Sequence, residues 1–321
     1  MAQPTISQVH PVNRPLTNIS LVYMQAQTNF VAAQVFPIVP VDKRSDAYFV
    51  YTKNDWFRDE AQLRGDATES AGSGYNLSTG TYTCDVFAFH KDVGEQTFNN
   101  SDAPLNPARD ATEFVTSRLL LRREIQWATD YFATSVWATD STPSNLWSDY
   151  AASDPVSDIE TGKRTVLINT GFLPNTLVVG YDVWIKLKNH PDIIDRIKGA
   201  TTPGMPAIAT RQAVASVFEV ERLLVCMGVK ATNVESETAA YGFIQGKHAL
   251  LAYVAPSPSL LAPSAGYCFE WTGVSQGSGQ TVGIKTLDVP LKAATRYEGQ
   301  VAFDHKVIGS DLGYFFSSAV S

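Results

Sequence analysis

The sequence predicts an α+β fold, and three observations lead to that prediction. Residues 45–92 and 263–321 consist largely of short runs rich in β-branched and aromatic residues, which are typical of strands. One amphipathic stretch, residues 108–138, is far longer than an average helix of about 11–12 residues. Between residues 166 and 256, strand-like and helix-like segments alternate.

Composition and charge exclude several classes of protein. The chain has 321 residues, of which 44% are hydrophobic and 18% charged, so it contains enough apolar material for one large or two smaller cores. Its formal net charge of -7 disfavours a protein that grips nucleic acid through phosphates. Cys84, Cys226 and Cys268 lie far apart without CxxC spacing, which predicts reduced thiols. With no membrane-length apolar run and no signal-peptide core, we expect a cytoplasmic product.

The N-terminal residues 1–44 are expected to form an extended arm. Prolines recur through this stretch and disfavour helix, apart from a short helix that is possible around residues 21–33. An arm of this kind has little reason to stay ordered alone, so we expect it to lie on a partner. The prolines are Pro4, Pro11, Pro15, Pro37 and Pro40.

Two strands follow the arm and are separated by an unusually long connector. The segments "DAYFVYTKNDWF" and "GTYTCDVFAFHKDV" have strand character. Residues 58–80 between them are glycine-rich, charged and much longer than a hairpin turn requires. This connector is either an unpartnered surface loop or a projecting two-stranded ribbon. Because an isolated ribbon is marginal in water, the second interpretation requires a surface for it to lie on.

Residues 108–138 carry the clearest helix pattern in the sequence. At 1.5 Å per residue, the predicted helix is roughly 40 Å long. Asp110 is the expected cap. The predicted apolar stripe is Ala111, Phe114, Leu121, Ile125, Ala128, Phe132 and Val136. Arg118, Arg122 and Arg123 are placed on the polar flank, either as a solvated face or as a patch that receives the acidic connector of another subunit. The predicted contact residues are Asp59, Glu60, Arg64, Asp66, Glu69, Arg118, Arg122 and Arg123.

The alternating region begins with a strand that ends in "VVGYD". Gly180 is expected to turn the strand into a helix capped by Asp182, and Pro191 marks a break or the start of a second helix. A strand, a tight turn and a helix N-terminus are also the components of a phosphate site. However, the single glycine does not complete GxGxxG, so an α/β enzyme that binds a small molecule near Gly180 remains only an alternative.

Motifs for other chemistry are incomplete. "VSQGSGQT", residues 274–281, lacks the first glycine and the lysine of a phosphate-binding loop. The five histidines are scattered without metal-ligand spacing, and no G-x-S-x-G elbow occurs. A Ser–His–Asp set assembled in space stays open, because triads are recognised by geometry. We therefore predict no catalytic residues, no cofactor and no metal.

The order of the predicted segments, together with several short stretches of sequence, resembles the major capsid protein of tailed double-stranded DNA bacteriophages. "FVAAQVFPIVPV" followed by "DAYFVYTKNDWFRDEAQLR" looks like an arm that leads into an extended loop, and "YEGQVAFDHKVIGSDLGYFFSSAV" looks like the closing segment. The resemblance implies an N-arm over 1–44, an extended β-hairpin loop over 45–92 and an axial domain over 165–260. A peripheral domain would comprise 93–164 and 261–321, with its spine helix over 110–137.

The same resemblance implies a non-enzymatic protein that assembles through hexamers and pentamers into an icosahedral shell around phage DNA. Its partners would be copies of itself and the portal, with scaffolding that is separate or absent, and decoration proteins as in some members of the family. No membrane partner and no sequence-specific DNA binding are expected. The protein would reside in the virion after assembly in the host bacterial cytoplasm. The alternative is another phage structural protein, such as a tail component.

Overall fold

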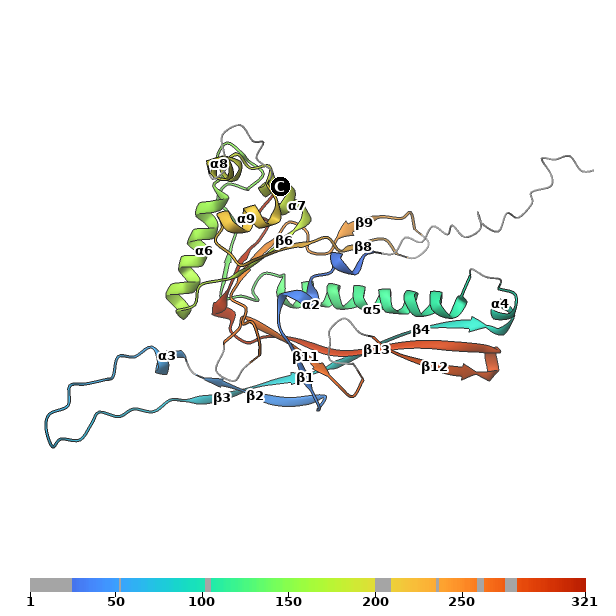
Figure 1. Cartoon of the computed structure of the whole chain (residues 1–321), viewed down its shortest axis with the longest axis horizontal. Coiled ribbons are helices and arrows are strands. Elements are labelled where there is room, and N and C mark those ends of the chain that lie inside the picture. Colours follow the sequence, from blue (N-terminus) through green and yellow to red (C-terminus); the bar gives the residue numbers. More distant parts are fainter. Residues whose placement is uncertain are drawn as a thin grey trace, which may run out of the picture.

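The computed structural model describes residues 25–51, 53–101, 105–199, 209–234, 237–258, 263–274 and 282–321. The predictions for most of the N-terminal arm and for the turn "VSQGSGQT" lie outside these ranges. Figure 1 shows an elongated molecule with a helix-rich unit at one end, a long helix lying on a sheet, and a hairpin that projects beyond both.

The long helix α5 (Pro107–Tyr131) packs along a five-stranded sheet. This sheet comprises β1 (Ile38–Val41), β4 (Asp85–Gly94), β11 (Gly266–Trp271), β12 (Gly283–Val289) and β13 (Ala294–Val307). The strand order is β1-β11-β13-β12, and β4 pairs with β13. The 14-residue strand β13 pairs antiparallel with three other strands along its length, so it is the central strand of this sheet. Two short helical turns, α4 (Glu95–Asn99) and η3 (Pro290–Lys292), lie next to it.

The predicted long helix is confirmed, but its ends and its buried face differ from the prediction. The side chain of Asn106, not Asp110, caps the helix by accepting a hydrogen bond from the Arg109 amide at 3.2 Å. Phe114 is 40% exposed, whereas the buried positions recur mostly every four residues. They are Ala111, Val115, Leu119, Arg123, Glu124, Trp127 and Tyr131. The prediction placed the buried face wrongly because it relied on apolar residues alone. Two residues of the observed buried face, Arg123 and Glu124, are charged.

A second five-stranded sheet has the order β5-β14-β10-β6-β7. Its strands are β5 (Thr139–Ser141), β6 (Thr176–Gly180), β7 (Arg222–Cys226), β10 (Ala249–Ala252) and β14 (Gly313–Phe316). Leu177 and Val179 point into a core with the helices around them, while Val178 points into a second core with Trp127 of α5. The surrounding helices are α6 (Pro155–Thr170), α7 (Tyr181–Lys188), α8 (Pro191–Gly199) and α9 (Arg211–Val217).

Three stretches predicted to belong to the peripheral domain pack instead with the second sheet. β14 pairs with β10, so the C-terminal end of the chain joins the second sheet instead of the sheet on which α5 packs. Helix α6 also packs there, with Gly162 against Leu251 and Phe316. Residues 139–141, 155–164 and 313–321 therefore pack with the region predicted as axial. The sequence missed this because the pairing of β14 with β10 joins strands about sixty residues apart.

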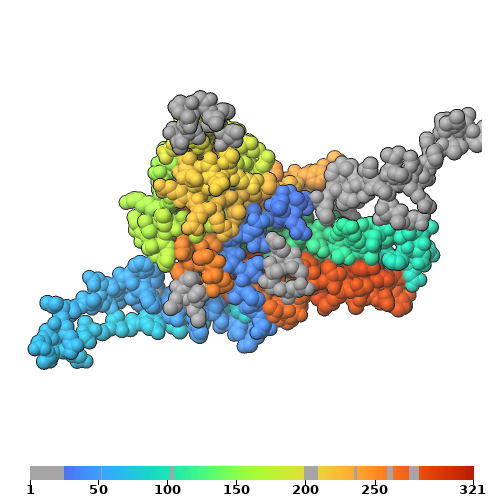
Figure 2. Space-filling model, in the orientation of Figure 1, coloured from blue at the N-terminus to red at the C-terminus, as the bar shows by residue number. Residues whose placement is uncertain are grey.

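The projecting hairpin consists of β2 (Ser45–Tyr51) and β3 (Leu77–Thr83), which pair antiparallel from Ser45↔Thr83 to Tyr51↔Leu77. A single helical turn, α3 (Lys53–Trp56), begins the connection, and every residue from 57 to 76 is exposed. In Figure 2 this part, coloured blue to cyan, is a thin extension beyond the body. The long connector is present as predicted, but regular pairing stops at Tyr51 and Leu77, so residues 57–76 form a loop and not a two-stranded ribbon.

The remaining described elements link these units. They are η2 (Gln27–Asn29), α2 (Ala32–Val35), β8 (Val229–Ala231), β9 (Tyr241–Phe243) and η4 (Ser310–Leu312). All three cysteines are buried free thiols, as predicted. Within the described ranges, no helix combines the length and the apolar character needed to cross a membrane.

Candidate functional site

The strand end at Gly180 has a structural explanation that needs no nucleotide. A side-chain carbon at Gly180 would overlap the backbone carbonyl oxygen of Gly246, and the Gly180 amide donates to the carbonyl of His248 at 3.0 Å. Gly180 is also the N-cap of α7, so Asp182 lies in the first turn and the predicted cap is wrong. Glycine is thus required because the loop at 246–248 approaches the strand end closely.

We expect Gly180→Ala to destabilise the protein by roughly 3 kcal/mol, because the new methyl group meets backbone and not a movable side chain. Chemical denaturation followed by tryptophan fluorescence would measure the loss. Gly94→Ala is the matched control, since its nearest neighbour is the Thr97 hydroxyl at 3.9 Å. A loss for Gly180→Ala no larger than for Gly94→Ala would contradict the close packing described here.

A Ser–His–Asp grouping does assemble in space, but its geometry is wrong for catalysis. Ser153 Oγ lies 3.0 Å from His190 Nε2, and Asp192 Oδ2 lies 3.7 Å from His190 Nδ1. The backbone amide of Asp192 donates to Nδ1 at 3.3 Å, so Nε2 carries the proton and donates to the serine. Ser153 in turn donates to the carbonyl of Asp149 at 2.6 Å. A general base must accept from the nucleophile, and this imidazole cannot.

The environment of this histidine supports a structural role. The His190 ring is fully buried, and burial lowers its pKa, against the opposing effect of Asp192 and Asp154. The described part of the chain also contains no group of three or more His, Cys, Asp or Glu residues that could hold a metal ion.

The predicted contact residues of the connector are all exposed. Arg58 and Glu60 form a loose ion pair at 3.8 Å, and Arg64 Nε donates to the carbonyl of Thr68 at 2.6 Å. These are contacts within the loop, which points away from α5 in Figure 1. The chain therefore does not bring its own acidic loop residues to the arginines.

Arg118 and Arg122 lie on the exposed side of α5. The guanidinium of Arg118 lies 5.1 Å from the ring centre of Phe114, and that of Arg122 lies 4.9 Å from the ring centre of Phe87. Arg122 also donates to Gln126 at 2.8 Å. Each aromatic ring orients its arginine while leaving the charge at the surface.

The prediction that Arg123 lies on the polar flank of the helix is wrong, because this residue is buried. It is 4% exposed, and its Nη2 lies 3.1 Å from Cys268 Sγ and 3.4 Å from Glu270 Oε2. Burial opposes the charge of Arg123, but Cys268 and Glu270 outweigh burial and raise its pKa. Since Glu270 is itself 1% exposed, the pair is an internal tie between α5 and β11.

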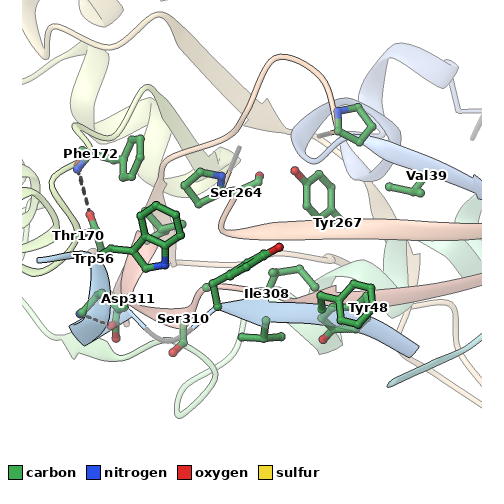
Figure 3. Close-up of a pocket in the computed structure, with 18 of the residues that line it drawn as sticks. Val39, Tyr48, Trp56, Thr170, Phe172, Ser264, Tyr267, Ile308, Ser310 and Asp311 are labelled. Atoms are coloured by element: carbon green, nitrogen blue, oxygen red, sulfur yellow. Dashed lines mark hydrogen bonds and ion pairs between the residues drawn. The ribbon is translucent and has the colours of Figure 1, made fainter. Parts of the chain in front are cut away.

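The sequence did not reveal an apolar groove beneath the base of the hairpin. Figure 3 shows the cavity lined both by Tyr48 and Trp56 of the hairpin region and by Phe172, Tyr267 and Ile308 of the body. The cavity volume is ≈ 920 Å³. Its two charged groups, Lys53 and Asp311, neutralise each other at 2.7 Å. The lining comes from segments far apart in sequence, so no local pattern marks it.

Large apolar side chains next to the groove and along the loop are exposed to an unusual degree. They include Phe49, Trp56, Phe57, Leu63, Tyr75 and Leu77, with Leu63 fully exposed. Trp56, Tyr51 and Tyr75 contact one another, with ring centres about 6 Å apart. Exposed apolar side chains gathered in this way are typical of surfaces that contact another molecule.

Two named phage proteins are similar in sequence to this chain along almost its whole length. A major capsid protein of Burkholderia phage BcepMu is 26% identical over 322 residues, covering 97% of this chain and 98% of that protein. A major capsid protein of Pseudomonas phage JBD67 is 25% identical over 317 residues, with the same coverage. No protein-family model matches the sequence.

Solved structures show the same fold. A phage-related protein from Bordetella bronchiseptica RB50 superposes with a TM-score of 0.68 at 20% identity, covering 92% of this chain and 93% of that one. The capsid structure of cyanophage P-SCSP1u gives a TM-score of 0.59 at 10% identity, covering 94% and 91%. Over almost its whole length this chain is therefore similar in sequence to phage major capsid proteins, and it shares the α+β fold of phage capsid proteins.

Proposed function

We propose that copies of this chain assemble into the shell of a phage head. The observation that carries the proposal is the hairpin. Its connector, residues 57–76, is exposed throughout, yet it carries Leu63 and leads back to the aromatic groove. A monomer gains nothing from such a projection, whereas a neighbouring copy would cover it.

The contacts would repeat around symmetry axes. A surface on one copy that meets a different surface on the next generates closed rings, and we propose hexamers and pentamers of this kind in an icosahedral shell. Many moderate contacts per subunit make the closed assembly stable. The portal and any scaffolding or decoration proteins belong to the same proposal, as do assembly in the host bacterial cytoplasm and residence in the virion.

The packaged DNA would be enclosed without sequence-specific binding. The net charge of -7 disfavours tight phosphate contacts, and an acidic interior avoids sticking to the genome. The role proposed for the chain is structural and not enzymatic. In support, the serine–histidine grouping has the wrong tautomer and the glycine at the strand end serves packing.

Negative-stain microscopy of the purified full-length chain would test the proposal, with co-expressed scaffold if required. We expect shells, or hexameric rings that convert to shells. A stable small oligomer under all these conditions would instead favour a different phage component.

The exposed arginines of α5 are the proposed receptor for the acidic connector of another copy. Reversing the connector charges, with Asp59, Glu60, Asp66 and Glu69 changed to Lys, is expected to reduce shell yield strongly. Combining these changes with Arg118→Glu and Arg122→Glu is expected to restore part of the yield, because opposite charges face each other again. Gradient sedimentation of both variants would measure this. If the combined variant instead loses more shell yield than the connector variant alone, the proposed contact between the connector and these arginines is wrong.

A further inference from the structure

Glu124, in the middle of α5, is a buried carboxylate whose two oxygens both serve other parts of the chain. It is 0% exposed. Oε2 accepts hydrogen bonds from the backbone amides of Val31 at 3.0 Å and Ala32 at 2.8 Å. Oε1 accepts one from the side-chain amide of Gln245, which lies between β9 and β10. One side chain thus joins the long helix, the N-terminal segment and the loop that leads into the second sheet.

The N-terminal segment it holds is residues 25–36, here named the strap. The Gln25 side chain pairs with both backbone groups of Val229, donating at 2.6 Å and accepting at 2.9 Å. The carbonyl of Asn29 accepts from the Met227 amide at 3.3 Å, and the carbonyl of Gln34 accepts from Arg222. The strap therefore crosses from β8 over α5 before it continues into β1.

Apolar contacts bury the strap but do not determine its register. Val31, Ala32, Val35 and Phe36 are all at most 3% exposed and share a core with Trp127 and Tyr131 of α5. Such packing is non-directional, whereas two hydrogen bonds to successive amides specify one position along the strap. Val31, the N-cap of α2, offers no side-chain acceptor, so the carboxylate supplies the cap that this turn lacks.

The hydrogen-bonding partners of Glu124 are matched to a carboxylate side chain. Burial raises its pKa, and the hydrogen bonds from Ala32, Val31 and Gln245 reduce this shift without reversing it. All three partners are donors, so a side chain with only acceptor oxygens satisfies every one of them. An apolar residue of similar size would fill the space and leave three buried donors without this acceptor.

We propose that Glu124 is a positioning residue for assembly, which fixes the position and direction of the strap and thereby the point from which the N-terminal arm starts. This inference rests on the proposed function, in which the N-terminal arm contacts another copy. The carboxylate holds the start of the arm relative to both sheets at once, through α5 on one side and Gln245 on the other. Losing it frees the register of the strap, and the arm then starts from a variable place.

The test compares Glu124→Ala with Glu124→Gln in the full chain. The glutamine keeps one oxygen that accepts from both Val31 and Ala32, and the amide of Gln245 can turn its oxygen toward the new NH₂ group. We expect Glu124→Ala to lose hydrogen-exchange protection across the strap and to lose shells, and Glu124→Gln to retain both. Val166→Ala, on the buried face of α6, is a destabilised control that lies away from the strap and should still form shells.

A second variant guards against failure of Glu124→Ala to fold. Gln25→Ala removes the bonds to Val229 without touching α5, and it should lower shell yield while the melting temperature stays near that of the unchanged chain. The proposal is overturned if Glu124→Ala keeps strap protection, or if it forms shells as well as Val166→Ala at equal stability. If the unchanged chain forms no shells, the proposed function fails, while hydrogen exchange still shows whether Glu124 holds the strap.

Discussion

Removing residues 58–74 is expected to leave a folded subunit that forms no shells. The deletion joins the chain just beyond Trp56 and before Tyr75, so the aromatic contacts at the hairpin base and the Lys53–Asp311 ion pair remain. All the deleted residues are exposed, and their side chains pack into none of the described cores. The melting temperature should therefore change little, while the apolar and charged surface proposed to meet another copy is lost.

Two measurements separate the outcomes of this deletion. Circular dichroism and thermal melting report the fold, and gradient sedimentation with microscopy reports shells. A variant in which a Gly-Ser linker of the same length replaces residues 58–74 is the matched control for chain length, and it should also fail to assemble because it lacks the side chains. Normal shells from either variant would show that the connector has no role in assembly.

Arg123→Ala is expected to destabilise the subunit by about 3–5 kcal/mol, since it leaves the buried Glu270 without its cation. The guanidinium also lies 5.1 Å from the ring centre of Phe303, so the truncation opens a cavity beside β13 as well. For a chain of this size, the melting temperature should fall by roughly 10 °C. Denaturant titration of the purified subunit gives the free energy directly.

The control is the double variant Arg123→Met with Glu270→Leu, which removes both charges and retains most of the volume. Replacing a buried ion pair by apolar side chains is often neutral, so the double variant should lose far less stability than Arg123→Ala. A loss below about 1 kcal/mol for Arg123→Ala would indicate that the charge is not held inside the subunit as described.

Several elements were predictable because their signals are local. Gly180 between an apolar run and an amphipathic stretch correctly marked the end of β6 and the start of α7. The spacing between two strand-like runs indicated a long connector, which lies between β2 and β3. The resemblance to capsid proteins depended on the order of these elements, which is also a linear property of the chain.

The groove and the buried charges were not predictable in the same way. Arg123 and Glu124 look like surface residues of an amphipathic helix, and only partners from distant segments make their burial possible. Cys268 and Glu270 satisfy the first, and Val31, Ala32 and Gln245 satisfy the second. The groove is lined from the hairpin, α6 and the ends of β11 and β13, so no window of sequence contains it.

By itself, the sequence determined which segments become helix or strand and in which order they follow, because periodicity and capping act over a few residues. Only the tertiary structure decided which face of α5 is buried, that β14 joins the second sheet, and why Gly180 must be glycine. Each of these depends on a contact between residues about sixty or more positions apart. The free energy of such a contact comes from mutual burial and matched hydrogen bonds, which exist only once both partners are in place.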